Sequence, residues 1–154
     1  MDQLNDPESN IYKETIQKQK EFISKRFKHI KNRYLDDEVG CCGEKDIITK
    51  HLNNGPAQNL VHTFFNYNTK ECTLCKKKKG EDGIRQFERA HCNRYSRGDL
   101  LLLAIDELYI DNETPIKVGD ILKLFIKKHE LCPIYMLCNN CHNQYDNHFY
   151  PEIR

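Results

Sequence analysis

Two short stretches decide the fold, Cys72-Thr73-Leu74-Cys75 and Cys138-Asn139-Asn140-Cys141-His142. Each contains a Cys-x-x-Cys pair, which can wrap a tight turn around one face of a tetrahedral zinc ion. Two such pairs supply the four thiolates of a closed structural site, so the sequence predicts zinc bound by Cys72, Cys75, Cys138 and Cys141. The long insertion between the pairs contains His91, and the second pair runs directly into His142. The sequence therefore predicts a zinc-stabilised frame that holds two histidines close together.

The composition bounds the size and the cellular setting of this frame. The chain has 154 residues, enough for one domain with a modest core plus an appendage. Charged residues make up 31% and hydrophobic residues 38%, so apolar mass is scarce and a structural metal would compensate for a thin core. No apolar run is long enough to span a membrane, and the polar N-terminus lacks the apolar segment of a signal peptide. We therefore expect an intracellular protein (cytoplasm or nucleus), not a secreted one, whose eight cysteines are thiols and metal ligands rather than disulfides.

Charge is unevenly distributed along a chain whose net charge is only +1. Between residues 72 and 97 there are eight basic side chains and three acidic ones, whereas residues 98–131 hold four basic and seven acidic. The lysine run at positions 76–79, taken alone, is typical of a solvated loop. Four arginines around His91 favour a nucleic-acid-binding surface, because guanidinium groups bind phosphate with paired hydrogen bonds. The sequence predicts that DNA binds through Arg85, Arg89, Arg94 and Arg97.

Helical segments precede the first cysteine pair and form an N-terminal helical region, residues 1–67. In residues 10–35 apolar side chains recur every three to five positions, which predicts a long amphipathic helix. Residues 44–52 predict a short helix that ends at Asn53-Asn54-Gly55-Pro56. Residues 57–67 are helix or strand, and we expect them to pack under the first cysteine pair. The long helix is best interpreted as a structural arm. The alternative is a helix whose surface binds a protein partner or a second copy of the chain.

The remainder, residues 68–154, is the expected zinc-binding domain. Residues 84–91 alternate as a strand that ends at His91, and residues 133–137 form a second extended segment. Between them lies a helical insert at about residues 99–130, with one helix over 100–108 capped by Asp99 and another over 116–129. A terminal helix over 139–149 carries His142. The expected fold class is α+β, a zinc-stabilised core with added helices.

The histidines and arginines supply the groups that phosphodiester cleavage requires. A water must lose a proton, and the ordinary pKa of histidine near ~6.5 suits a base for that step. A metal must neutralise the charge that develops on the phosphate, and neutral imidazole is a suitable metal ligand. Arginines hold the strand in line by binding phosphate. His91 and His142 are therefore the candidate catalytic residues.

At these residues the chain resembles the HNH endonucleases that carry a four-cysteine zinc site. The shared order covers residues 72–146: a Cys-x-x-Cys pair, a basic loop, a strand ending in Ala90-His91, an insert, and Leu-Cys-x-x-Cys-His-x-x-x-Asp. The resemblance implies a ββα-metal fold that hydrolyses DNA. It implies that His91 is the general base and that His142 binds a catalytic Mg²⁺ or another divalent metal. The four cysteines match the structural zinc ligands of that family.

Two positions depart from the family pattern. Ala90 stands where many members have a metal-binding Asp, and Pro133 stands where the signature usually has an Asn. The residues that could substitute are Glu88, Asn140, Asn143 and Asp146. The missing ligands favour an alternative function, a catalytically inactive zinc module that binds nucleic acid or a protein partner. The retained pair of histidines favours the nuclease.

The remaining cysteines leave smaller alternatives open. Cys92 and Cys132 could compete as zinc ligands, and His129 together with Cys132 could support a second zinc. Cys41 and Cys42 are adjacent, which is poor geometry for two ligands of one ion, so we interpret them as free thiols. A redox or zinc-storage protein would use the thiols but would give the arginines no role, which makes it the least favoured function.

Overall fold

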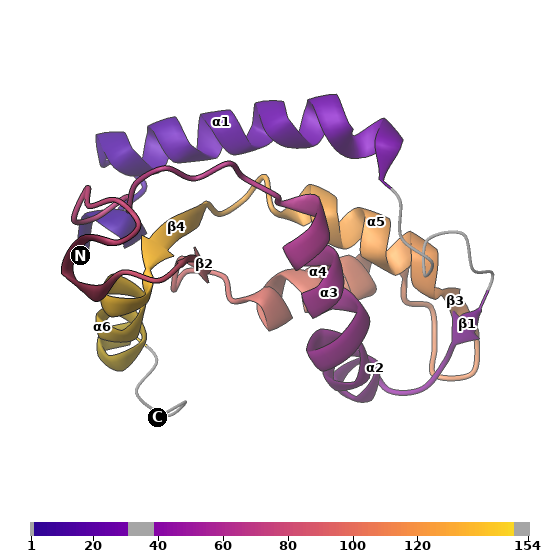
Figure 1. Ribbon diagram of the computed structural model, residues 1–154. Coiled ribbons are helices and arrows are strands. Elements are labelled where there is room, and N and C mark those ends of the chain that lie inside the picture. Colours follow the sequence, from indigo (N-terminus) through magenta and orange to yellow (C-terminus); the bar gives the residue numbers. More distant parts are fainter. Residues whose placement is uncertain (1, 31–38, 150–154) are drawn as a thin grey trace.

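The computed structural model describes residues 2–30 and 39–149 (Figure 1). The chain is mixed α+β, as expected, with two small antiparallel sheets. The α-helices are α1 (Asn10–Arg26), α2 (Lys45–Leu52), α3 (Gln58–Phe64), α4 (Arg97–Leu108), α5 (Val118–Lys128) and α6 (Asn139–Phe149). The strands are β1 (Gly40–Cys41), β2 (Phe87–His91), β3 (Ile116–Lys117) and β4 (Ile134–Cys138). Four short helical turns complete the elements, namely η1 (Asp2–Asn5), η2 (Phe27–His29), η3 (Asn53–Ala57) and η4 (Glu81–Gly83).

One end of the molecule, which we call the zinc end, consists of two strands and a helix. β2 pairs antiparallel with β4, and His91 lies opposite Ile134 in the register. α6 begins at the residue directly after β4. Tyr135 and Tyr145 are almost fully buried in the core of this end, together with cysteines from both pairs. The strand that ends at His91, the extended segment 133–137 and the terminal helix 139–149 are thus confirmed.

The other end, which we call the helical end, contains the insert. α4 packs against α5, α2 and η3 (Figure 1). Its core draws on Leu52 and Phe64 from before the first cysteine pair and on Leu101, Ile105 and Phe125 from the insert. The insert and the earlier helices therefore share one hydrophobic core. That core contains residues from both sides of the expected domain boundary between residues 67 and 68.

The short helix predicted over 44–52 is confirmed as α2, which ends at Leu52. The segment that follows is η3, a π-helical turn that leads directly from α2 into α3. Pro56 lacks an N–H and interrupts the α-helical hydrogen bonds, and the wider turn accommodates that interruption. The expectation that residues 57–67 pack under the first cysteine pair is wrong. Leu60, Phe64 and Phe65 are buried in the core of the helical end.

The insert also begins differently from the prediction. α4 starts at Arg97, and its cap is Ser96 rather than Asp99. The hydroxyl of Ser96 accepts from the N–H of Asp99 at 3.1 Å, and the Asp99 carboxylate accepts from the N–H of Ser96 at 2.9 Å. This is a reciprocal capping box, in which Asp99 forms the second half. As a result, Arg97 lies in the first turn of α4 and is half-buried.

The sequence prediction missed the ribbon formed by β1 and β3. Gly40 pairs with Lys117 and Cys41 with Ile116, so α5 begins at Val118 rather than at position 116. A ladder of two residues carries no periodic pattern that could have revealed it. Cys41 and its neighbour Cys42 have free thiols, as expected.

α1 extends over both ends of the molecule (Figure 1). The hydroxyl of Ser9 caps it by accepting from the N–H of Tyr12 at 3.2 Å. Tyr12 packs into the core of the zinc end and Ile23 into that of the helical end. The predicted helix over 10–35 is confirmed as α1 and η2, while its last positions, 31–35, lie outside the described residues. None of the described helices is long and apolar enough to cross a membrane.

Candidate functional site

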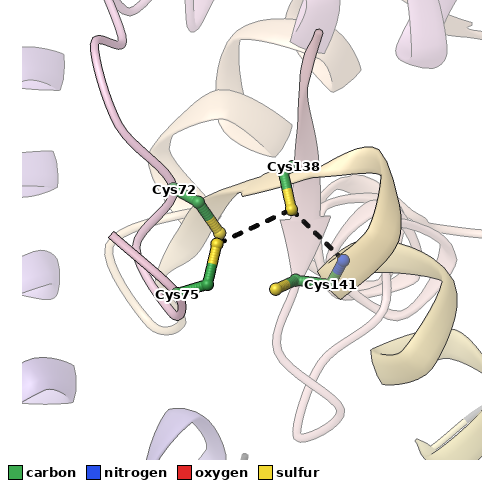
Figure 2. Close-up of side chains that lie close together, drawn as sticks. All are labelled: Cys72, Cys75, Cys138 and Cys141. Atoms are coloured by element: carbon green, nitrogen blue, oxygen red, sulfur yellow. Dashed lines mark hydrogen bonds between the residues drawn. The ribbon is translucent and has the colours of Figure 1, made fainter. Parts of the chain in front are cut away.

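The four cysteines of the two pairs converge on one point (Figure 2). Their sulfur atoms all lie within 4.8 Å of one another. The sulfurs of Cys75 and Cys138 are 3.9 Å apart. Zinc–sulfur bonds of ~2.3 Å at tetrahedral angles separate neighbouring sulfurs by about 3.8 Å. The cluster therefore has the donors and the spacing to hold a metal ion such as zinc.

The backbone of the first pair forms a tight turn tied to β4. The N–H of Cys72 donates to the carbonyl of Lys77, and the N–H of Lys76 donates to the carbonyl of Cys72, each at 3.0 Å. Lys76 has a φ of 62°, in the left-handed region. The N–H of Thr73 donates to the carbonyl of Met136 at 3.0 Å. This last bond holds the first pair beside the strand that leads into the second.

The surroundings favour the thiolate form, which is the form that binds metal, at Cys72, whereas burial raises the pKa of Cys75 and of Cys141. Burial raises the pKa of Cys72, but hydrogen bonds from the backbone of both pairs outweigh that effect and lower the pKa to about 7. The N–H of Cys141 donates to the sulfur of Cys138 at 3.3 Å. Cys72 and Cys138 are buried, whereas Cys75 and Cys141 are half-buried. The four-cysteine cluster is thus buried on the side of Cys72 and Cys138 and partly accessible to solvent on the side of Cys75 and Cys141.

Cys92 and Cys132 form a disulfide that joins the end of β2 to the loop before β4. The prediction that the cysteines are thiols or metal ligands is therefore wrong for this pair. Antiparallel pairing of β2 and β4 brings the two residues together across 40 positions of sequence. The second zinc site at His129 and Cys132 is not formed, because Cys132 is bonded to Cys92 while His129 contacts His91. Within residues 2–30 and 39–149, the four-cysteine cluster is the only group of three or more Cys, His, Asp or Glu side chains close enough to share an ion.

His91 ends β2 and contacts the helical end of the molecule. Its Nε2 lies 3.2 Å from Nε2 of His129. Nδ1 of His129 lies 2.8 Å from the carbonyl oxygen of Phe125, one turn earlier in the chain. A carbonyl can only accept, so the proton of neutral His129 is on Nδ1 and its Nε2 is an acceptor. It follows that Nε2 of His91 donates, and that Nδ1 of His91 carries an unshared electron pair.

Nδ1 of His91 makes no hydrogen bond to any described residue. His91 is half-buried and lines a cavity, which gives small molecules a route to the residue. A cavity of about 250 Å³ lies beside the ring. Its charged and titratable lining consists of His62, Glu88, Arg89, His91 and Arg97.

Both rings of the histidine pair are neutral at pH 7. Burial lowers the pKa of His91 well below its ordinary value, and electrostatic interaction with His129, Arg97 and His142 lowers it further. Burial also lowers the pKa of His129 to about 4, against the opposing effect of its backbone hydrogen bonds. Neutral rings are what the chain of hydrogen bonds from His91 to Phe125 requires.

The four predicted phosphate-binding arginines divide into two groups. Arg89 and Arg97 line the cavity beside His91. Nε of Arg89 donates to the carbonyl of Phe65 at 2.7 Å, and Nε of Arg97 donates to Oδ1 of Asn53 at 2.9 Å. These bonds fix two guanidinium groups on β2 and α4. Arg85 and Arg94 are exposed and do not line this cavity.

His142 lies on α6 between two carboxylates. Its Nδ1 is 2.8 Å from Oε2 of Glu88, and its Nε2 is 3.5 Å from Oδ2 of Asp146. His142 does not line the cavity beside His91, but Glu88 touches both. Glu88 and Asp146 are two of the four residues that the sequence offered as substitute metal ligands, and both contact His142. Asn140 instead donates to the carbonyl of Asp82 at 3.3 Å.

The two departures from the family pattern have structural explanations. Ala90 points into the core of the zinc end, where it is 2% exposed and opposite Tyr135. An aspartate there would bury an uncompensated charge. Pro133 is also buried, and its carbonyl accepts from the N–H of Cys92 at 3.4 Å. Neither position faces the cavity beside His91.

Sequence reasoning missed two residues that shape this site, His129 as a partner of His91 and Gln19. A histidine that follows the apolar run of α5 was visible, but its contact with His91 depends on long-range packing. Gln19 offered a clearer signal. It lies seven residues after Tyr12 and four before Ile23, on the buried stripe of α1, and it is 1% exposed.

No protein-family model matches the chain, and no curated protein and no solved structure is similar to it. The chemistry of the site therefore rests on its own residues. These are four thiol ligands, an imidazole that lines a cavity, two fixed guanidinium groups, and a second imidazole between carboxylates.

Proposed function

We propose that this protein is a metal-dependent endonuclease of the HNH type that hydrolyses phosphodiester bonds of DNA. The observation that carries the proposal is Nδ1 of His91. The hydrogen bonds from His91 to His129 and from His129 to Phe125 leave it unprotonated, and His91 lines a cavity together with Arg89 and Arg97. A base beside fixed cationic groups is what hydrolysis of a polyanion needs.

The order of elements supports the same proposal. A strand that ends in His91, a second strand, and a helix that carries His142 follow one another at the zinc end. The four-cysteine cluster lies between the loop before β2 and the start of α6. This is the arrangement that the resemblance to the HNH endonucleases implies.

The residues have distinct roles in this proposal. Nδ1 of His91 accepts the proton of the attacking water, and its low pKa keeps the ring neutral and ready at pH 7. Arg89 and Arg97 bind oxygens of the scissile phosphate. A divalent cation would supply neutralisation of the developing charge. Glu88, His142 and Asp146 would be its carboxylate and imidazole donors, although the three do not converge on one point in this structure.

A second function is favoured by a different observation. Both ring nitrogens of His142 lie next to carboxylates, and apart from the cysteines no group of three donors converges on one point among the described residues. A strongly lowered pKa also makes His91 a weaker base. These features favour a zinc module that binds nucleic acid without cleaving it.

A plasmid-nicking assay separates the two functions. The zinc-loaded protein is incubated with supercoiled DNA and Mg²⁺, Mn²⁺ or Ni²⁺, beside His91→Ala and a control, His51→Ala, whose side chain is exposed on α2. We expect nicking by the wild type and by the control, and a loss of ~100-fold or more in His91→Ala. Equal nicking by His91→Ala would overturn the mechanism. DNA that is shifted on a gel but never cut would establish the binding module instead.

A further inference from the structure

His129 is a histidine that the proposed cleavage does not use directly, yet it is fully buried. Its ring lies 4.9 Å from the ring of Phe65 and 4.7 Å from that of Phe125, centroid to centroid. Burying a polar ring among phenyl rings costs free energy unless both nitrogens find partners. Both do, since Nδ1 donates to the carbonyl of Phe125 and Nε2 accepts from His91.

The segment that carries His129 is held in place by Gln19 of α1. The Gln19 amide nitrogen donates to the carbonyl of His129 at 2.5 Å and to that of Cys132 at 2.8 Å. Its oxygen accepts from the N–H of Ile134 at 2.8 Å. The disulfide from Cys132 to Cys92, the residue after His91, adds a covalent tie. The loop between α5 and β4 is therefore fixed against the end of β2.

We infer that His129 is a positioning residue that fixes the tautomer of His91 and so exposes Nδ1 as the electron pair of the proposed base. The carbonyl of Phe125 can only accept a hydrogen bond, so Nδ1 of His129 must donate to it. Each later assignment follows from it. This inference rests on the proposed function only for its catalytic consequence, because the tautomers themselves can be measured in a protein that cuts nothing.

The helical insert has a role in this arrangement. His129 is the C-cap residue of α5, and Arg97 in the first turn of α4 lines the cavity beside His91. The two strands and α6 alone would leave Nε2–H of His91 without this acceptor. A histidine without a fixed partner exchanges between its two tautomers, and in one of them Nδ1 carries the proton and cannot act as the base.

The test combines NMR with kinetics on the full chain. Long-range ¹H–¹⁵N correlation spectra at pH 7.5 report which nitrogen of each imidazole carries the proton. We expect opposite tautomers, with the proton on Nδ1 in His129 and on Nε2 in His91. Two variants form a matched pair. His129→Phe keeps an aromatic ring that suits the apolar surroundings but removes the acceptor, whereas His129→Gln keeps an acceptor.

We expect His91 to lose its single tautomer in His129→Phe and to retain it in His129→Gln. In the nicking assay, kcat should fall about tenfold or more in the former and stay within about threefold in the latter, with KM unchanged in both. A proton on Nε2 of His129, or a His91 tautomer unaffected by His129→Phe, would overturn the inference. Opposite tautomers in a protein that never cleaves DNA would support the positioning and reject the nuclease.

Discussion

The buried histidine makes a quantitative prediction about stability and pH. The pKa of His129 is about 4 in the folded protein, compared with an ordinary value of about 6.5. Between these two values the unfolded chain binds a proton at this position and the folded chain does not. Stability therefore rises with pH in this window, is complete above pH ~6.5, and is lost progressively as the pH falls toward about 4.

The size of the effect follows from the same two values. Each unit of pKa difference corresponds to about 1.4 kcal/mol, so the full contribution of His129 is about 3 kcal/mol. Between pH 7.5 and pH 5.5 the contribution changes by about 1.3 kcal/mol. This narrower range is the useful one, because thiolate ligands release zinc as they become protonated at lower pH.

Urea unfolding followed by circular dichroism at pH 7.5, 6.5 and 5.5 measures this change. His129→Gln is the control, because glutamine keeps a hydrogen-bond acceptor and does not titrate. Protonation of the cysteines affects both proteins alike, so the difference between them reports His129 together with its effect on the pKa of His91. We expect the wild type to lose about 1.3 kcal/mol more than the variant from pH 7.5 to pH 5.5. Parallel losses in the two proteins would show that His129 is not held neutral by burial, and the reasoning would fail.

Three further predictions concern the zinc end, α1 and the arginines. Cys138→Ser should lose stoichiometric zinc, measured by a colorimetric chelator, and the signal of the zinc end in circular dichroism, whereas the exposed Cys42→Ser should keep both. Gln19→Leu should cost about 3 kcal/mol in urea unfolding, because it leaves three backbone groups unpaired, and a cost near that of the exposed Gln17→Leu would contradict the contacts described. Replacing both Arg89 and Arg97 by Gln should weaken DNA binding and reduce the slope of log K against log salt concentration by about two. An unchanged slope would show that the cavity does not contact DNA phosphates.

Local patterns were sufficient to predict the zinc end. Cys-x-x-Cys spacing defines ligand geometry within four residues, so Cys72, Cys75, Cys138 and Cys141 could be identified without a fold. Alternation and helical periodicity likewise predicted β2, β4 and α6, because each reflects one buried face of one element. The amphipathic helix α1 was predicted for the same reason.

The contacts that define the chemistry could not be predicted in this way. His91 meets His129 across 38 positions and Glu88 meets His142 across 54, and neither contact leaves a periodic trace. The disulfide was missed because a reducing compartment was expected for all eight cysteines together. The pairing of β2 with β4, which brings the sulfurs of Cys92 and Cys132 together, is not visible in the sequence. The cap of α4 was assigned to Asp99 because both halves of a capping box are good caps, and sequence alone does not say which half comes first.

The site therefore depends on elements outside the strand–strand–helix unit. That unit supplies His91 and His142, but the partner of His91 is the C-cap residue of α5, and one of the two cavity arginines comes from α4. Gln19 of α1 then fixes the loop between α5 and β4 through three hydrogen bonds. Two hydrophobic cores that each combine early and late segments hold these pieces together. Since no single segment can orient the imidazole of His91, the insert and α1 belong to the functional site and are not additions to it.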